Sequence, residues 1–215
     1  MSLRLKLTTL IIMAALLLPG TGVLAAPSLF GPTGLITIPT ADVIQPGQFN
    51  VAGFMAGENY IVAINGAPIP SLEMGIGVRE QGDSPGYLNA KLQVIPETRD
   101  FPGIAVGALD IADSLQRKMY VVLSKNMPDL GVRAHLGIET PGDPLFAGVS
   151  KVLNTVSVNR PGEKGLILQT ILLGEVHGSD LSVGAQIRFT PNITLHLAYH
   201  DLQEGVIGLS INGWF

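Results

Sequence analysis

Apolar side chains recur at every second position through most of the chain after residue 26. Between residues 86 and 94, Leu88 and Leu92 share one face of an extended segment, while Asn89 and Lys91 share the other. Successive side chains of a β-strand point to opposite faces, so this period of two predicts strands with one apolar and one polar face. The same alternation is present in residues 71–79, 130–139, 180–189 and 193–201, and helical periodicity is absent after residue 26.

Turn-forming sequences separate these segments at short intervals, for example in residues 81–86, 140–144 and 160–162. Short turns join antiparallel neighbours, so each strand is expected to pair with the next one along the chain. About twelve strands are predicted, with ten or fourteen as alternatives, because residues 103–111 and 165–174 alternate poorly. The predicted strands are residues 48–56, 59–66, 71–79, 86–95, 103–111, 118–125, 130–139, 145–153, 165–174, 180–189, 193–201 and 205–215.

The polar faces carry too few charges for a sheet exposed to water. Only 14% of the residues are charged and 47% are hydrophobic, whereas about a quarter of a typical soluble domain is charged. No apolar run after residue 26 approaches the roughly 20 residues of a membrane-spanning helix. The sequence therefore favours an all-β fold, a single antiparallel up-and-down transmembrane barrel. The alternative is a soluble periplasmic β-sandwich acting as a binding module, and the aromatic content of 6% is low for the two interfacial girdles of a barrel.

The composition argues against several other classes of protein. The absence of cysteine excludes disulfides, thiolate zinc sites and a cysteine nucleophile. The net charge is -4 and the basic residues are scattered, so no nucleic-acid partner is expected. We also expect no cofactor.

The first 25 residues have the pattern of a secretory signal peptide. Arg4 and Lys6 precede an apolar run from residue 10 to 18, and small residues follow. Cleavage after Ala25 is favoured, which makes residues 26–47 the first segment of the mature chain and residues 48–215 the barrel. An uncleaved anchor is the alternative, but Pro19 interrupts the apolar run too early for a membrane span.

A motif rich in glycine, proline and threonine follows the predicted cleavage site. Residues 29–41 read LFGPTGLITIPTA, and Gly47 follows a proline shortly afterwards. This stretch resembles the opening motif of the YjbH family, Gly-x-Thr-Gly-Leu-Ile-x-x-Pro-Thr/Ser-Ala. The resemblance implies an exported outer-membrane β-barrel linked to exopolysaccharide production. The residues that carry it are Gly31, Thr33, Gly34, Pro39, Thr40, Ala41 and Gly47.

Physical chemistry alone gives this motif a structural role, with direct substrate contact as the alternative. Gly31 and Gly34 permit positive φ, while Pro39 and Pro46 limit strand pairing and are expected to shape the approach to the first long strand.

Histidines and serines offer little support for an enzyme. His196 and His200 share a strand face, but positions four apart in a strand lie about 13 Å apart, too far to chelate one ion. Ser182 could approach either histidine, yet no nucleophile motif surrounds it. We therefore expect no catalytic residue and no metal site.

Seven ionisable residues fall on the predicted polar faces and are candidates for the lumen. They could set the selectivity of a water-filled pore, or opposite charges could pair and plug the interior. These residues are Glu73, Arg79, Lys91, Arg133, His135, Glu139 and Arg188.

The chain ends in an alternating strand that finishes on Phe215. This ending resembles the C-terminal signal that the outer-membrane barrel assembly machinery reads, although Gly213 stands where an apolar residue is usual. The expected partners are outer-membrane lipid, that machinery, and polysaccharide or secretion partners, for a structural, pore or export-associated role.

Overall fold

The computed structural model describes residues 26–80, 86–142, 145–158 and 166–215, and the predicted signal peptide lies outside them. Twelve strands form, as predicted, and most bounds agree with the prediction within two or three residues. The strands are β1 (Gln48–Ala56), β2 (Asn59–Ile69), β3 (Leu72–Glu80), β4 (Tyr87–Ile95), β5 (Gly103–Leu109), β6 (Lys118–Met127), β7 (Val132–Thr140), β8 (Leu145–Val158), β9 (Leu166–His177), β10 (Asp180–Thr190), β11 (Ile193–His200) and β12 (Glu204–Trp214).

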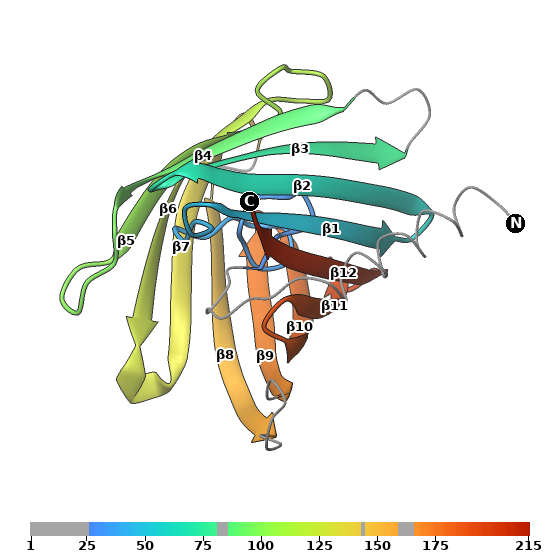
Figure 1. Ribbon diagram of the computed structural model, residues 1–215. Coiled ribbons are helices and arrows are strands. Elements are labelled where there is room, and N and C mark those ends of the chain that lie inside the picture. The colour runs from blue at the N-terminus through green and yellow to red at the C-terminus, as the bar shows by residue number, and fades with distance from the viewer. Residues whose placement is uncertain (1–25, 81–85, 143–144, 159–165) are drawn as a thin grey trace, which may run out of the picture.

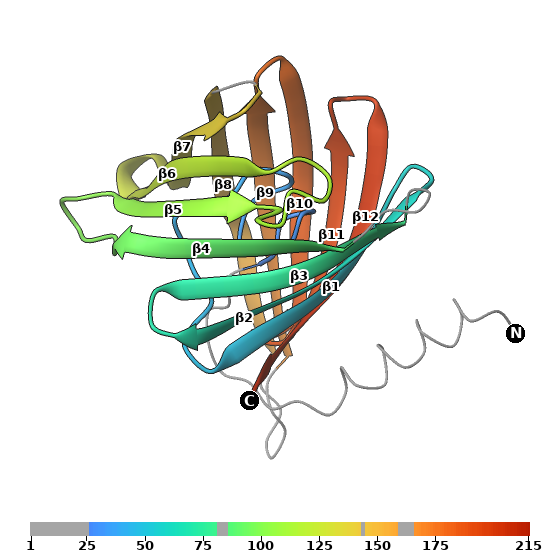
Figure 2. The same cartoon turned by 90° about the horizontal axis from the view of Figure 1, so that it is seen from above.

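All twelve strands belong to one closed antiparallel sheet, so the prediction of an up-and-down barrel is confirmed. Each strand pairs with its neighbours in sequence, and β1 closes the ring against β12 from Gln48 opposite Trp214 to Ala56 opposite Val206. Figures 1 and 2 show this ring from two directions. Closure removes every free edge and excludes the alternative of a two-sheet sandwich.

The barrel carries its apolar side chains outside and its polar side chains inside. In β4, Leu88 and Leu92 are 46% and 45% exposed, whereas Asn89 and Lys91 are 2% and 1% exposed. This is the reverse of a soluble protein and matches the lipid-facing surface of a transmembrane barrel. Within the described part of the chain, no helix has the length and hydropathy needed to cross a membrane.

Four large aromatic rings on the lumen side each lie over a glycine of the neighbouring strand. A Cβ atom added to Gly137 would fall 2.1 Å from the ring of Phe146, its partner in the β7–β8 register. A side chain at that glycine would therefore compete with the ring for the same space. The four pairs are Phe54 with Gly208, Tyr87 with Gly77, Tyr120 with Gly107, and Phe146 with Gly137.

The N-terminal segment, residues 26–44, lies inside the barrel (Figures 1 and 2). Its apolar side chains pack against inward-facing residues of the wall in two clusters. Leu35, Ile36 and Ile38 join Tyr120, Phe146 and neighbouring residues, and Leu29 joins a second group. The lumen therefore contains a small hydrophobic core formed by the segment and the barrel together.

Two local expectations about the motif are wrong. Gly34 has no positive φ; it is needed because a Cβ there would lie 2.3 Å from the Ile38 carbonyl oxygen. Pro39 does not prevent pairing, since it forms a β-bridge with Gly34 inside the lumen. Gly31 and Gly47 do have positive φ, 106° and 80°.

We expect Gly137→Ala to destabilise the folded barrel by about 1–3 kcal/mol, because the new methyl group overlaps the Phe146 ring. Gly53→Ala is the matched control in β1, where an added Cβ meets nothing within 4 Å. Urea unfolding of both variants in detergent micelles, followed by heat-modifiable gel migration, gives the comparison. Equal midpoints for the two variants would contradict the proposed role of the ring.

Candidate functional site

The segment inside the lumen is a compact double loop. Pro27 forms a β-bridge with Thr33, and Gly34 forms one with Pro39. Between the second pair, the N–H of Leu35 donates to the carbonyl of Ile38 at 3.0 Å. Further N–H groups, among them those of Leu29, Gly34 and Thr40, also donate to carbonyls within the segment. Other N–H groups of the segment donate to side chains of the barrel wall.

Glu175 of β9 accepts several of these N–H groups at once. The N–H groups of Ile36 and Thr37 donate to its carboxylate at 2.9 and 2.8 Å, and the N–H of Ile38 lies at 3.4 Å. The Thr37 hydroxyl donates at 2.5 Å. Consecutive backbone N–H groups that converge on one point form an anion-binding concavity, and here the anion is a side chain of the barrel.

Glu73 of β3 holds the other loop. The backbone N–H and the hydroxyl of Thr33 donate to its two oxygens at 2.7 and 2.8 Å, and the N–H of Ile44 lies at 3.4 Å. Lys91, its cross-strand partner in β4, lies 3.1 Å from the same carboxylate and donates to the Thr33 carbonyl at 2.9 Å. A buried ion pair and one threonine therefore form a single network.

Polar side chains of β4 and β6 bind further backbone groups of the segment. Asn89 donates to the Phe30 carbonyl at 2.7 Å, and Gln93 donates to the Ala41 carbonyl at 2.8 Å. Ser124 accepts the N–H of Ala41 at 2.8 Å. The segment is thus attached to the wall through its main chain around much of its length.

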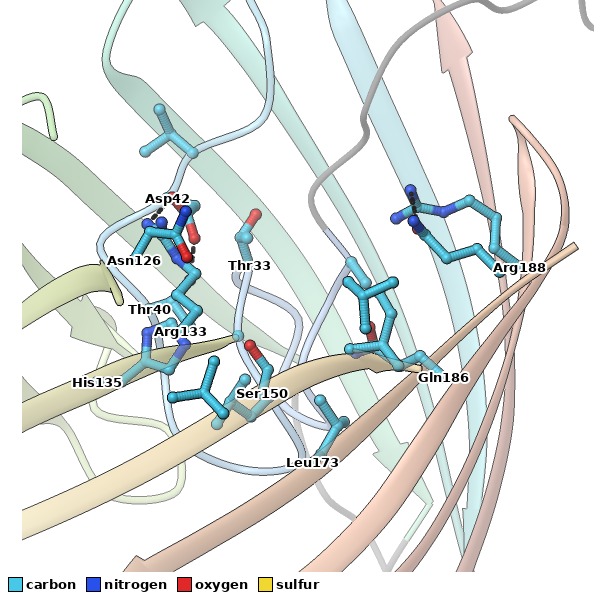
Figure 3. A pocket seen from close by; sticks show the side chains of 18 of the residues that line it. Thr33, Thr40, Asp42, Asn126, Arg133, His135, Ser150, Leu173, Gln186 and Arg188 are labelled. Carbon is cyan, nitrogen blue, oxygen red and sulfur yellow. Dashed lines mark hydrogen bonds and ion pairs between the residues drawn. The ribbon is translucent and has the colours of Figure 1, made fainter. Parts of the chain in front are cut away.

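Arg133 of β7 binds the end of the segment through an ion pair. One of its nitrogens lies 2.7 Å from Asp42, and another is bonded to Glu97. Figure 3 shows Arg133 and Asp42 together on one side of a cavity that borders the segment.

The other predicted lumen charges lie away from the segment's carboxylate anchors. His135 bonds to Ser124 at 2.8 Å, and Glu139 bonds to Lys118 at 2.6 Å and to His177 at 3.0 Å. Arg188 donates to Gln169 at 3.2 Å, while Arg79 lines a smaller cavity with Tyr87. Charge pairs and residues 26–44 both occupy the lumen, and a polypeptide segment there had not been predicted from the sequence.

The most important anchor missed by the sequence analysis is Glu175. The predicted strand ended at residue 174, whereas β9 continues to His177. A lone carboxylate in the apolar run from residue 166 to 176 was the signal available. Asn89, Gln93 and Ser124 were also missed as anchors, although Asn89 lies on the same strand face as Lys91.

Serine and histidine side chains do approach each other in the lumen. Ser182 lies 3.0 Å from Nδ1 of His200, and Ser210 lies 2.8 Å from Nε2 of His196. Ser182 also accepts the N–H of Asp201 and is buried. The 3.0 Å distance and the burial of Ser182 give this pair the geometry of an internal hydrogen bond.

Phe215 lies at the seam where the barrel closes. Its N–H donates to the Gly47 carbonyl at 3.0 Å, and its ring stacks on Phe49 of β1 with 6.3 Å between centroids. The side chain is 74% exposed on the outer surface.

Comparison with known proteins gives a family match and several structural alignments at low identity. No curated protein matches the chain. The outer membrane protein Omp33 of Acinetobacter baumannii aligns over 78% of this chain and 98% of its own, with 9% identity and a TM-score of 0.45. The NanC porin aligns over 78% and 99%, with 12% identity and a TM-score of 0.43. The N-terminal β-barrel domain of Pseudomonas aeruginosa OprF covers 78% and 98%, with 11% identity and a TM-score of 0.24.

A family model described as exopolysaccharide biosynthesis protein YbjH matches residues 26–160, which include the whole lumen segment and the first eight strands. That match spans more than half of the chain and contains the motif, Glu73 and Lys91. The chain therefore belongs to the YjbH family.

Proposed function

We propose that the protein is an outer-membrane barrel of exopolysaccharide production whose lumen is closed by its own N-terminal segment. The observation that carries this proposal is the attachment of residues 26–44 to Glu73 and Glu175 inside the barrel. Under this proposal the motif of the family is a plug, and the barrel is closed in its resting state instead of being a permanently open pore.

The chemistry of the attachment supports closure. Each carboxylate accepts at least two short hydrogen bonds from the segment, and bonds to a charged group contribute about 1.5–3 kcal/mol each. The apolar residues Leu35, Ile36 and Ile38 add burial against the wall. Releasing the segment would expose these groups and remove its N–H and hydroxyl donors from both carboxylates, and only Lys91 of the wall would stay beside Glu73.

The outer surface supports a place in the membrane. Residues 1–25 would direct export and be removed, and the exposed apolar side chains of the strands would then face lipid. Polysaccharide or secretion partners would meet the barrel at its two ends.

Current through single barrels in a planar lipid bilayer tests the plug. We expect the parent protein to conduct little, and Glu175→Gln to show frequent openings, because an amide side chain presents one acceptor oxygen and an N–H₂ group to several N–H donors. Glu58→Gln is the control, since Glu58 is exposed in the turn between β1 and β2. A parent barrel that conducts steadily would overturn the proposed closure.

A labelling experiment keeps the test independent of conductance. The chain has no cysteine, so Ile36→Cys introduces a unique thiol in the buried segment. Adding Glu175→Gln should accelerate maleimide labelling at least about tenfold, the equivalent of losing one charge-assisted hydrogen bond. Equal rates with and without this substitution would contradict the anchoring role of Glu175.

Leu92→Arg should reduce the stability of the barrel in lipid by about 2–4 kcal/mol if the residue lies near the bilayer midplane. Leu92 is exposed on the outer face of β4, and Leu130→Arg in the short turn before β7 provides the control. Reversible folding into phospholipid vesicles measures both. A negligible difference between the two variants would argue against lipid contact at Leu92.

Deleting Phe215 should slow assembly, because the residue secures the seam through its bond to Gly47 and its stacking on Phe49. In a reconstituted system with the barrel assembly machinery, the truncated chain should accumulate in a protease-sensitive form. Folding at the parental rate and yield would show that the machinery does not read this residue.

A further inference from the structure

A cavity of about 510 Å³ lies between the lumen segment and strands β7 to β10. Arg133 lies near the start of β7 and Arg188 near the end of β10, so the cavity is at the barrel end where β1 begins and β12 finishes. Its volume is in the range of small-molecule sites, which is about 300–1,000 Å³. Figure 3 shows Gln186 and Arg188 on one side of it and Asn126, Arg133 and His135 on the other.

The cavity is lined by hydrogen-bond donors and acceptors and by a group of aliphatic side chains, which we call the apolar floor. Amide side chains come from Asn126, Gln169 and Gln186, and hydroxyl groups from Thr40 and Ser150. Leu173 and other aliphatic residues provide the apolar part. An amide offers both a carbonyl acceptor and two N–H donors. A ligand with acceptors only would pair with the N–H groups and leave the carbonyl oxygens without a donor.

Two nearly buried side chains at this cavity lack partners that they need. Gln186 is 5% exposed and His135 is 4% exposed, and the Nε2 atom of each has no hydrogen-bond partner among the described residues. An unsatisfied buried polar group costs about 1–3 kcal/mol, so a side-chain rotation that brings either Nε2 atom to a ligand oxygen would be favourable. This observation is independent of the cavity's size and shape.

Charge does not single out an anion as the ligand. Arg133 is already paired with Asp42 and Glu97, so its charge and that of Asp42 are balanced within the protein. Arg188 also lines the cavity, and its guanidinium donates to Gln169 of the wall. Hydroxyl groups, in contrast, donate to carboxylate and carbonyl oxygens and accept from amide and guanidinium N–H groups.

We propose that this cavity binds one or two sugar units of a saccharide chain through their hydroxyl groups, with Gln186 and Ser150 among the binding residues. The proposal rests on the proposed role in exopolysaccharide production and deepens it by assigning a binding site. The apolar floor contacts the C–H face of a sugar ring. Because the segment forms one wall, a bound saccharide would touch Thr40 and the plug directly.

Saturation-transfer NMR of the full-length chain, folded in a detergent without sugar headgroups, tests the site. The probes are maltohexaose, an oligogalacturonate of similar length and inorganic phosphate. We expect transfer from the protein to both saccharides, and no displacement of either by millimolar phosphate. A response to oligogalacturonate alone, or displacement by phosphate, would identify an anion site and overturn the hydroxyl-based proposal.

Two variants on different strands locate the binding. Gln186→Leu should weaken saccharide affinity about tenfold, and Ser150→Leu should abolish transfer by filling the cavity. Gln203→Leu is the control, because Gln203 is exposed in the turn before β12. Heat-modifiable migration verifies that each variant is folded. If the folded Gln186→Leu and Ser150→Leu variants both show the same saturation transfer as the parent, the site is overturned.

The two proposals fail separately. A closed parent barrel that binds neither saccharide overturns the binding site and leaves the plug intact. A barrel that conducts freely but binds saccharide overturns the plug alone.

Discussion

Backbone N–H groups that enter a barrel lumen must find partners there, and two carboxylates of this barrel provide them. Glu175 accepts from three consecutive residues of the segment, and Glu73 accepts from both the backbone and the side chain of Thr33. Burying a carboxylate costs several kcal/mol unless it is well paired. The buried carboxylates require hydrogen-bond donors and the buried N–H groups require acceptors. Because each group satisfies the other, these bonds fix the position of the segment.

The size of the barrel leaves room for such a filling. Eight strands enclose a space that wall side chains can fill, and the diameter grows with strand number. Twelve strands leave additional room, which aromatic rings over glycines reduce and which residues 26–44 occupy. The lumen volume depends on the number of strands, and the inward aromatic residues and the N-terminal segment together occupy much of it.

The barrel could be predicted from the sequence, but the segment inside its lumen could not. Alternation reports on which face of a strand is apolar, so strand number, order and the outer surface could be predicted, and Leu88 and Lys91 point where the pattern places them. A loop inside a lumen has no period, because its residues are placed by turns and by distant partners. Glu175 and the segment are 137 to 139 residues apart, and only a folded structure brings them together.

The attachment through main-chain groups explains the composition of the motif. Residues 26–41 contain no charged side chain, and the one charged side chain of residues 26–44, Asp42, is paired with Arg133 of the wall. The barrel supplies the charges, and it recognises the path of the backbone more than particular side chains. Such a path depends on residues that set turns and permit close approach. Glycine at Gly31 and Gly34, proline at Pro39 and threonine at Thr33 meet these needs, which is why a motif of small and turn-forming residues can keep the segment in place.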